Sequence, residues 1–182
     1  MTEKQIENTI IKAKTGIEKY LEIMMLFPKV NVATDLNFQR KYNAFYRVRQ
    51  RNHYWYQTYY TYMEDQKGRE VKFPIVLRYF KENLERYEPS FSSKFVATHN
   101  PNMPIWDSRV LSAIGIKPPY YSSPTKYNKA EAIYSNIENW YVGFLASQKG
   151  INIVRKFNEL ISGSNLITDI KKIDFVLWKL GT

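Results

Sequence analysis

The residues of this chain best suited to covalent chemistry are Lys94 and Asp107, which lie 13 residues apart in the sequence. Lys94 lies in a segment with the pattern of a helix start, and Asp107 follows the loop 100–106 and precedes a second helical segment. An amine becomes nucleophilic when burial or neighbouring cations lower its pKa. A nearby carboxylate can take a proton or stabilise developing positive charge. The same residues also fit a surface lysine and an N-cap aspartate.

The segments that must position this pair have helical periodicity almost throughout. Apolar residues recur at helical spacing in 6–25, 36–63, 76–84, 91–99, 129–148, 151–162 and 167–180. Capping residues or a proline mark helix starts at Asp35, Pro74 and Asp107. No segment alternates as a strand does. We predict an all-α fold with a single compact domain of about seven to eight helices over 1–182, and a Pro- and Ser-rich loop at 117–125 as a candidate hinge.

The composition favours a polyanionic partner. Lys and Arg number 27 against 17 Asp and Glu, which gives a net charge of +10 and a pI near 9.6. Lysines and arginines placed on phosphates release condensed counterions, so a surplus of this size favours nucleic acid over a charge that serves only solubility. Aromatic residues make up 16% of the chain, and tyrosine suits a wet groove as well as a core.

Several kinds of site and segment are not expected. The chain has no cysteine, which excludes disulfides, cysteine-based zinc or iron–sulfur sites and a thiol nucleophile. With His53 and His99 as its two histidines and no clustered carboxylates, a divalent metal site would lack ligands. The polar start and the lack of a long apolar run predict neither a signal peptide nor a membrane span. We therefore expect a cytoplasmic protein, a monomer, without a metal or cofactor.

A block of basic and aromatic residues at 40–62 has two interpretations. Arg47, Arg49 and Arg51 precede Trp55, Tyr59 and Tyr62 in the chain. Arginines beside aromatic rings could form a groove where bases stack and phosphates are neutralised. However, the three aromatics lie on one face of a helix, and such a stripe is usually part of a core. The block supports binding without defining a site.

The residues around Lys94 and Asp107 resemble those of a known enzyme family. A lysine in a helix-opening turn is followed by a loop and by Pro104-Ile105-Trp106-Asp107-Ser108-Arg109-Val110. This arrangement resembles the helix-hairpin-helix DNA glycosylases, in particular the bacterial and archaeal proteins with an 8-oxoguanine-DNA-glycosylase fold. In that family a Pro-Val-Asp-x-x-Val segment carries the catalytic aspartate, and lyase-type members place a lysine at the start of the hairpin's second helix. The resemblance covers about 73–116 and, more weakly, 171–178.

Three features depart from the family pattern, and the first is one extra residue between Pro104 and Asp107. The family's hairpin is usually Leu-Pro-Gly-x-Gly, whereas 87–93 here contains no glycine, so close approach of backbone amides to a phosphate is not expected. Serines in this segment could donate hydrogen bonds instead. The separation of 13 residues between Lys94 and Asp107 is also shorter than the family's usual spacing. The connecting loop must still bring both groups together.

The resemblance implies a DNA glycosylase, with or without AP-lyase activity, that extrudes a damaged or modified base from duplex DNA. Lys94 would attack the sugar, and Asp107 would assist proton transfer and stabilise the cationic sugar. Candidate DNA contacts are Ser92, Ser93, Arg109, Arg47, Arg49 and Arg51. Candidate residues of the base pocket are Trp106, His99, Asp174 and Trp178. A core position for Trp178 and a helix-terminal cap for His99 are the competing interpretations.

Two other functions remain open. The glycine-free hairpin favours a non-catalytic DNA-binding module on the same fold. A helical interaction protein, such as a defence or regulatory component with an acidic partner, is the third alternative. The sequence does not identify the base, and a hypermodified phage base is as compatible as an oxidised purine.

Overall fold

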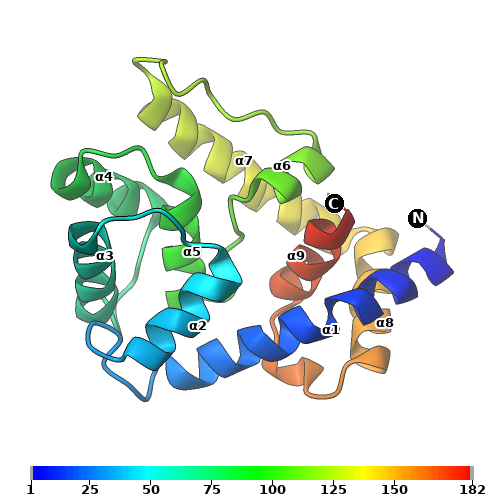
Figure 1. Cartoon of the computed structure of the whole chain (residues 1–182). Coiled ribbons are helices and arrows are strands. Elements are labelled where there is room, and N and C mark those ends of the chain that lie inside the picture. Colours follow the sequence, from blue (N-terminus) through cyan, green and yellow to red (C-terminus); the bar gives the residue numbers. More distant parts are fainter. Residues whose placement is uncertain (1, 181–182) are drawn as a thin grey trace.

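The chain is all helical, as its periodicity predicts. The computed structural model describes residues 2–180, and these contain no strand. Figure 1 shows the arrangement of the helices. Their bounds are α1 (Glu3–Leu26), α2 (Leu36–Tyr46), α3 (His53–Asp65), α4 (Phe73–Leu84), α5 (Pro89–His99), α6 (Ser108–Ile114), α7 (Lys126–Ala146), α8 (Gln148–Leu160), the 3₁₀ turn η1 (Ser164–Leu166) and α9 (Asp169–Leu180).

The predicted helical stretch over 36–63 is interrupted between α2 and α3. Arg47 ends α2 in the left-handed region with a φ of 56°, and Gln50 has the same φ. Asn52 then caps α3, because its side chain accepts a hydrogen bond from the Trp55 backbone N–H at 2.9 Å. The expected cap at the start of α2 is confirmed, since Asp35 accepts from the Phe38 N–H at 2.6 Å.

Helix α5 begins two residues earlier than the sequence pattern indicates. Pro89 occupies the first helical position, where its fixed φ is favourable, and the Glu88 carbonyl accepts from the Ser92 N–H at 2.9 Å. Lys94 therefore lies in the second turn of α5 and not in its opening turn. This correction matters because Lys94 is now too far along the helix to share in its free N-terminal amides.

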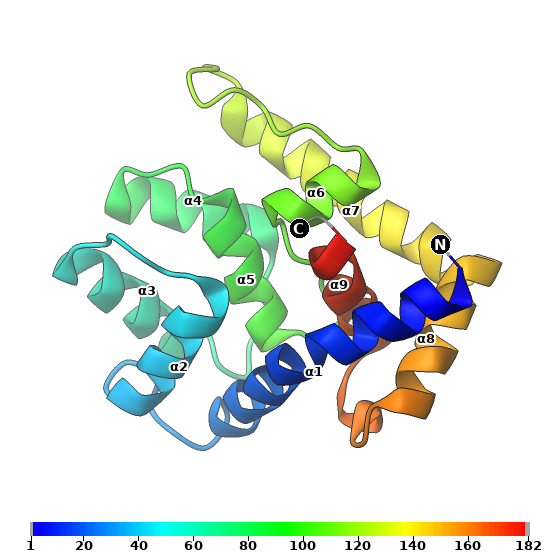
Figure 2. The same ribbon diagram turned by 45° about the vertical axis from the view of Figure 1, so that its right-hand side comes forward.

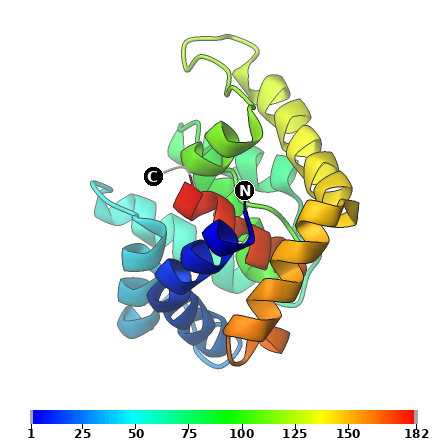
Figure 3. The same ribbon diagram turned by 90° about the vertical axis from the view of Figure 1, so that its right-hand side faces the viewer.

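Two groups of helices lie on either side of the middle of the molecule. Figures 1 and 2 show α2–α5 on one side and α6–α8 on the other, with α9 between them and α1 running along both groups. Figure 3 shows α1 and α9 beside α8. Helix α1 packs against α2, α8 and α9, and both α6 and α7 contact α9. The loop 117–125, the candidate hinge, therefore connects two helices of the same group.

The aromatic stripe of α3 belongs to the core. Trp55, Tyr59 and Tyr62 are 2%, 0% and 8% exposed, which confirms the core interpretation of these three residues. The Tyr59 hydroxyl lies 2.8 Å from that of Tyr42 on α2, so that each buried phenol has a hydrogen-bond partner. Packing of this kind fixes α2 and α3 together behind the residues that line the candidate site.

Candidate active site

A cavity of about 320 Å³ lies where α1, α2, α5, α6 and α9 meet. It brings together five residues that the sequence singles out: Lys94, Asp107, Arg47, Asp174 and Trp178. Its charged lining consists of Lys12, Lys19, Arg47, Lys94, Lys171, Lys179, Asp107 and Asp174. Six cations against two carboxylates make this cavity electropositive.

Lys94 is a buried amine at this cavity. It is 7% exposed, its Nζ donates to the Tyr46 carbonyl at 3.4 Å, and the Phe91 ring centroid lies 5.0 Å from Nζ. Burial lowers the pKa of Lys94; Asp107 opposes this effect, and the positive charge of Arg47 adds to it. A lowered pKa provides the free amine at a lower pH than an ordinary lysine would.

Asp107 faces Lys94 while it caps helix α6. Its Oδ1 accepts from the Arg109 N–H at 3.0 Å, and its Oδ2 lies 4.0 Å from Lys94 Nζ. The carboxylate is 22% exposed, which leaves it accessible from the cavity. One carboxylate therefore holds the start of a helix and forms an ion pair with the amine.

The loop before Asp107 is held in place from both helix groups. The Ser93 hydroxyl accepts from the Trp106 N–H at 2.8 Å, and the Tyr134 hydroxyl donates to the Pro104 carbonyl at 2.9 Å. At the other end of the loop, Thr168 donates to the Pro101 carbonyl at 2.6 Å. These bonds hold the loop so that Asp107 lies beside Lys94.

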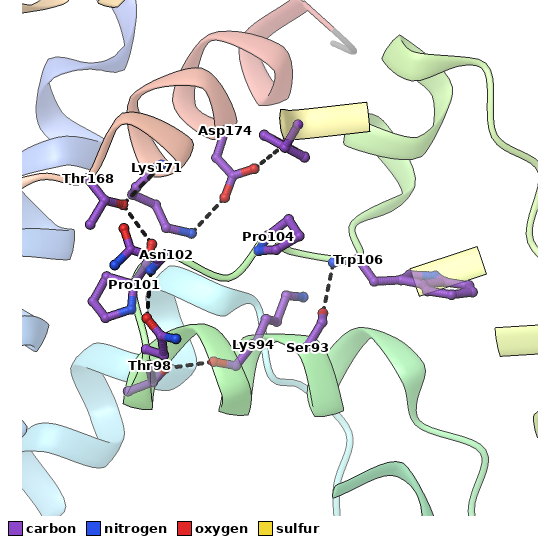
Figure 4. Close-up of polar contacts among 12 residues, drawn as sticks. Ser93, Lys94, Thr98, Pro101, Asn102, Pro104, Trp106, Thr168, Lys171 and Asp174 are labelled. Atoms are coloured by element: carbon purple, nitrogen blue, oxygen red, sulfur yellow. Dashed lines mark hydrogen bonds and ion pairs between the residues drawn. The ribbon is translucent and has the colours of Figure 1, made fainter. Parts of the chain in front are cut away.

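A second buried ion pair lies on α9 and was not predicted from the sequence. Lys171 Nζ lies 2.7 Å from Asp174 Oδ2, and the side chains are 2% and 5% exposed. The Tyr141 hydroxyl of α7 donates to the other oxygen of Asp174. Burial raises the pKa of Asp174, and Lys171 counteracts that shift. Figure 4 shows this pair and Lys94 extending toward one another from α9 and α5.

Trp178 provides a half-buried aromatic face at the same cavity. The guanidinium carbons of Arg109 and Arg47 lie 4.6 and 5.1 Å from the centre of its ring. Guanidinium groups at this distance hold the indole by cation–π attraction. Arg109 and Arg47 are thereby placed beside the cavity lining, where an anionic ligand would meet them.

Two candidates for the base pocket lie elsewhere. His99 is not among the residues that line this cavity, and its ring nitrogens lie 2.9 and 3.0 Å from the carbonyl oxygens of Phe95 and Met63. Trp106 is 4% exposed and its ring is parallel to that of Phe73, with centroids 6.2 Å apart. Both side chains pack within the protein, although the Trp106 backbone positions the loop.

The two serines proposed as phosphate contacts are fully buried. Ser92 donates its hydroxyl to the Glu88 carbonyl at 2.8 Å, and Ser93 donates to the Ser90 carbonyl at 2.9 Å. Each is 0% exposed. Their hydroxyls therefore stabilise α5 and its loop, and in this conformation they do not reach the surface.

The arginines at 47–51 have different surroundings. Arg51 forms an ion pair at 3.0 Å with Glu88, whose side chain is 8% exposed. Its guanidinium carbon also lies 5.1 Å from the centre of the Phe91 ring. Arg49 is exposed. Of the three arginines, Arg47 borders the cavity, Arg49 faces solvent and Arg51 holds the hairpin between α4 and α5.

Within residues 2–180, His, Asp and Glu side chains form no cluster of three that could hold a metal ion. None of the helices over the same residues combines the length and the apolar character that crossing a membrane requires. The chain matches no protein-family model, and comparisons with curated proteins and with solved structures likewise give no match.

Proposed function

We propose that this protein is a DNA glycosylase that removes a damaged or modified base and has AP-lyase activity. The observation that carries the proposal is the Lys94 amine, buried and 4.0 Å from the Asp107 carboxylate at an electropositive cavity. Burial disfavours the charged ammonium form of Lys94 and so favours the neutral amine. A buried lysine beside a carboxylate in a cavity is therefore a candidate nucleophile.

The chemistry begins with extrusion of the target nucleotide, because the glycosidic bond is inaccessible in stacked duplex DNA. The free amine of Lys94 attacks C1′, the C1′–N bond breaks, and its electron pair leaves with the base, which takes a proton. One proton of the resulting ammonium passes by way of Asp107 to the departing base, and a second moves from nitrogen to the sugar O4′ as the C1′–O4′ bond breaks, which gives a Schiff base between Nζ and C1′. Borohydride reduces this Schiff base to a stable covalent link.

Asp107 has two tasks in this scheme. Its Oδ2 is positioned to accept a proton from Lys94 by way of a small movement or a water. The negative charge also stabilises the cationic sugar as the base departs. Because Oδ1 is fixed by the Arg109 N–H, the carboxylate is oriented before the substrate binds.

The basic composition supports DNA as the substrate. The net charge is +10, and Arg47 and Arg109 lie beside the cavity where a phosphate of the extruded nucleotide would pass. Trp178 lines the cavity beside these two arginines and gives it an aromatic wall. We expect the protein to act as a cytoplasmic monomer without a cofactor.

A non-catalytic DNA-binding protein is the second candidate, and the hairpin between α4 and α5 favours it. The hairpin has no glycine, and its Glu88 carboxylate is buried against Arg51 at 3.0 Å. Arg51 is held by this ion pair, so its guanidinium does not extend toward a phosphate. Such a protein would bind DNA with a steep salt dependence and leave bases and abasic sites intact.

Borohydride trapping on a duplex with one abasic site separates these functions, since this substrate requires no knowledge of the base. Wild type is expected to form a covalent protein–DNA product, and Lys94→Gln is expected to form none. Lys12→Gln, at an exposed lysine of the same cavity, is the matched control and should still be trapped. If wild type is never trapped and releases no base from a panel of modified duplexes, the catalytic proposal is wrong.

A further inference from the structure

Two neighbouring tyrosines extend from the loop between α6 and α7 into solvent. Tyr120 is 86% exposed and Tyr121 is 66% exposed. They follow Pro118 and Pro119, which restrict the backbone before them. Large aromatic side chains exposed side by side leave apolar surface in water, which a ligand with flat apolar faces would cover.

This loop joins the hairpin between α4 and α5 through further aromatic contacts. The Tyr121 ring lies 5.9 Å from that of Tyr87 in the hairpin, and the Tyr127 ring lies 5.3 Å from Tyr87. The Tyr87 hydroxyl is buried and has no hydrogen-bond partner within the described chain. The loop therefore packs on the segment where the glycosylase resemblance would put a phosphate contact.

Lysines lie over these rings. Lys126 Nζ is 4.2 Å from the centre of the Tyr121 ring and donates to the Tyr121 carbonyl at 2.9 Å. Lys81 Nζ of α4 is 4.9 Å from the centre of the Tyr127 ring. We call these residues, together with the neighbouring Tyr120, the tyrosine–lysine cluster: Lys81, Tyr87, Tyr120, Tyr121, Lys126 and Tyr127.

The charge around the cluster is positive. Segments 81–88 and 117–129 contain five Lys and Arg and three Glu. One of these glutamates, Glu88, is neutralised by its ion pair with Arg51 at 3.0 Å. Exposed aromatic faces combined with lysines are the chemistry that proteins use to bind single-stranded nucleic acid.

We propose that the tyrosine–lysine cluster binds a strand of DNA through unpaired bases, as a second contact outside the cavity. This inference rests on the proposed function, because extrusion of a base leaves the opposite base of the duplex unpaired. Tyr120 and Tyr121 stack on bases, while Lys126 neutralises a phosphate of the same strand. The hairpin between α4 and α5 has no glycine, and Glu88 is buried in it, so it is not expected to contact a DNA phosphate. The cluster supplies a DNA contact in its place.

Binding of a fluorescein-labelled 15-residue oligothymidylate, followed by fluorescence anisotropy, tests the inference without any catalysis. Tyr120→Ala is expected to weaken binding at least about fivefold, and Tyr120→Trp to preserve it, because stacking requires only a flat ring. Lys126→Gln keeps the hydrogen-bond donor but removes the charge. It should reduce the slope of log affinity against log salt concentration by about 0.7.

Matched controls lie outside the cluster. Leu166→Ala removes a large apolar side chain that is 66% exposed, and Lys29→Gln removes an exposed lysine; both should bind as wild type does. The inference is overturned if wild type does not bind oligothymidylate, or if Tyr120→Ala and Lys126→Gln bind it as wild type does. Oligothymidylate binding involves no chemistry at Lys94, so a failed trapping assay and a failed binding assay remain separate results.

Discussion

Asp107 binds two groups at once: its Oδ1 accepts from the Arg109 N–H at 3.0 Å, and its Oδ2 lies 4.0 Å from Lys94 Nζ. The first contact stabilises helix α6 and the second orients the amine. A substitution that preserves the cap and removes the charge can therefore separate folding from catalysis.

Asp107→Asn is the substitution that makes this separation. Asparagine caps a helix as well as aspartate does, so the melting temperature should fall less than in Asp107→Ala. Trapping on the abasic duplex should slow by about 10²- to 10⁴-fold, as expected when a general acid–base group is lost. Asp107→Ala should slow trapping similarly but also lose about 1 kcal/mol of stability through the missing cap. If Asp107→Asn traps as fast as wild type, Asp107 has no catalytic role.

Burial is the main cause of the lowered Lys94 pKa, and Arg47 should lower further the pH at which the Lys94 amine becomes neutral. The positive charge of Arg47 contributes to the lowered pKa of Lys94, so Arg47→Met is expected to raise that pKa. Since the neutral amine is the nucleophile, the rising limb of the trapping rate should move to higher pH in the variant. Single-turnover rates measured across a pH series give this limb.

The control for this experiment is Arg49→Met, at an exposed arginine that is not among the causes of the Lys94 shift. Its pH profile should match that of wild type even if it binds DNA more weakly. A limb that stays in place, or moves to lower pH, in Arg47→Met would show that Arg47 does not act on the Lys94 amine.

The buried pair on α9 should be strongly coupled. Lys171→Met leaves the Asp174 carboxylate, 5% exposed, without its cation and should destabilise the protein by about 3–5 kcal/mol. Adding Asp174→Asn removes the unpaired charge and keeps an acceptor for the Tyr141 hydroxyl, so most of the stability should return. Urea unfolding of the two single variants and the double variant measures this coupling.

Lys172 provides the comparison for that cycle, because it makes an ion pair of the same spacing on the same helix. Its partner Asp169 is 54% exposed, and water can solvate that carboxylate after Lys172→Met. The loss should then be about 1 kcal/mol or less. Equal losses for Lys171→Met and Lys172→Met would mean that the Lys171–Asp174 pair is not coupled through burial.

The local sequence pattern predicts most of the helices but only part of the candidate site. Asp107 was predicted as an N-cap because that role depends on the residues directly after it. Lys171 was not predicted, since a Lys and an Asp three residues apart on a helix usually form a surface pair. Their burial arises only when α1, α6 and α8 surround α9.

Contacts between residues far apart in the sequence also explain why two predicted site residues, His99 and Arg51, lie outside the cavity. His99 has a polar ring in a loop-proximal position, but its ring packs at 4.7 Å against Phe95 and its nitrogens contact backbone carbonyls from two helices. Arg51 cannot be distinguished from Arg49 by local sequence. Its partner Glu88 lies 37 residues away, in a hairpin that only the folded chain brings close.

Arg51 should therefore matter for stability more than for DNA binding. Arg51→Met leaves Glu88 buried without its principal cation, and the expected loss at pH 7 is about 2–3 kcal/mol. Burial raises the pKa of Glu88 and Arg51 lowers it, so the variant should have a still higher Glu88 pKa. A carboxyl group whose pKa is raised in the folded state destabilises the folded protein at pH values where the group is charged. This destabilisation disappears as the pH falls and the group takes up a proton.

The stability difference between wild type and Arg51→Met should consequently shrink as the pH is lowered from 7 to about 4, near the ordinary pKa of a glutamate. Urea unfolding at several pH values measures this difference. Arg49→Met, which removes an exposed arginine, should unfold as wild type does at every pH. A loss in Arg51→Met that is independent of pH would indicate that packing of Arg51 on Phe91, and not its charge, holds the hairpin in place.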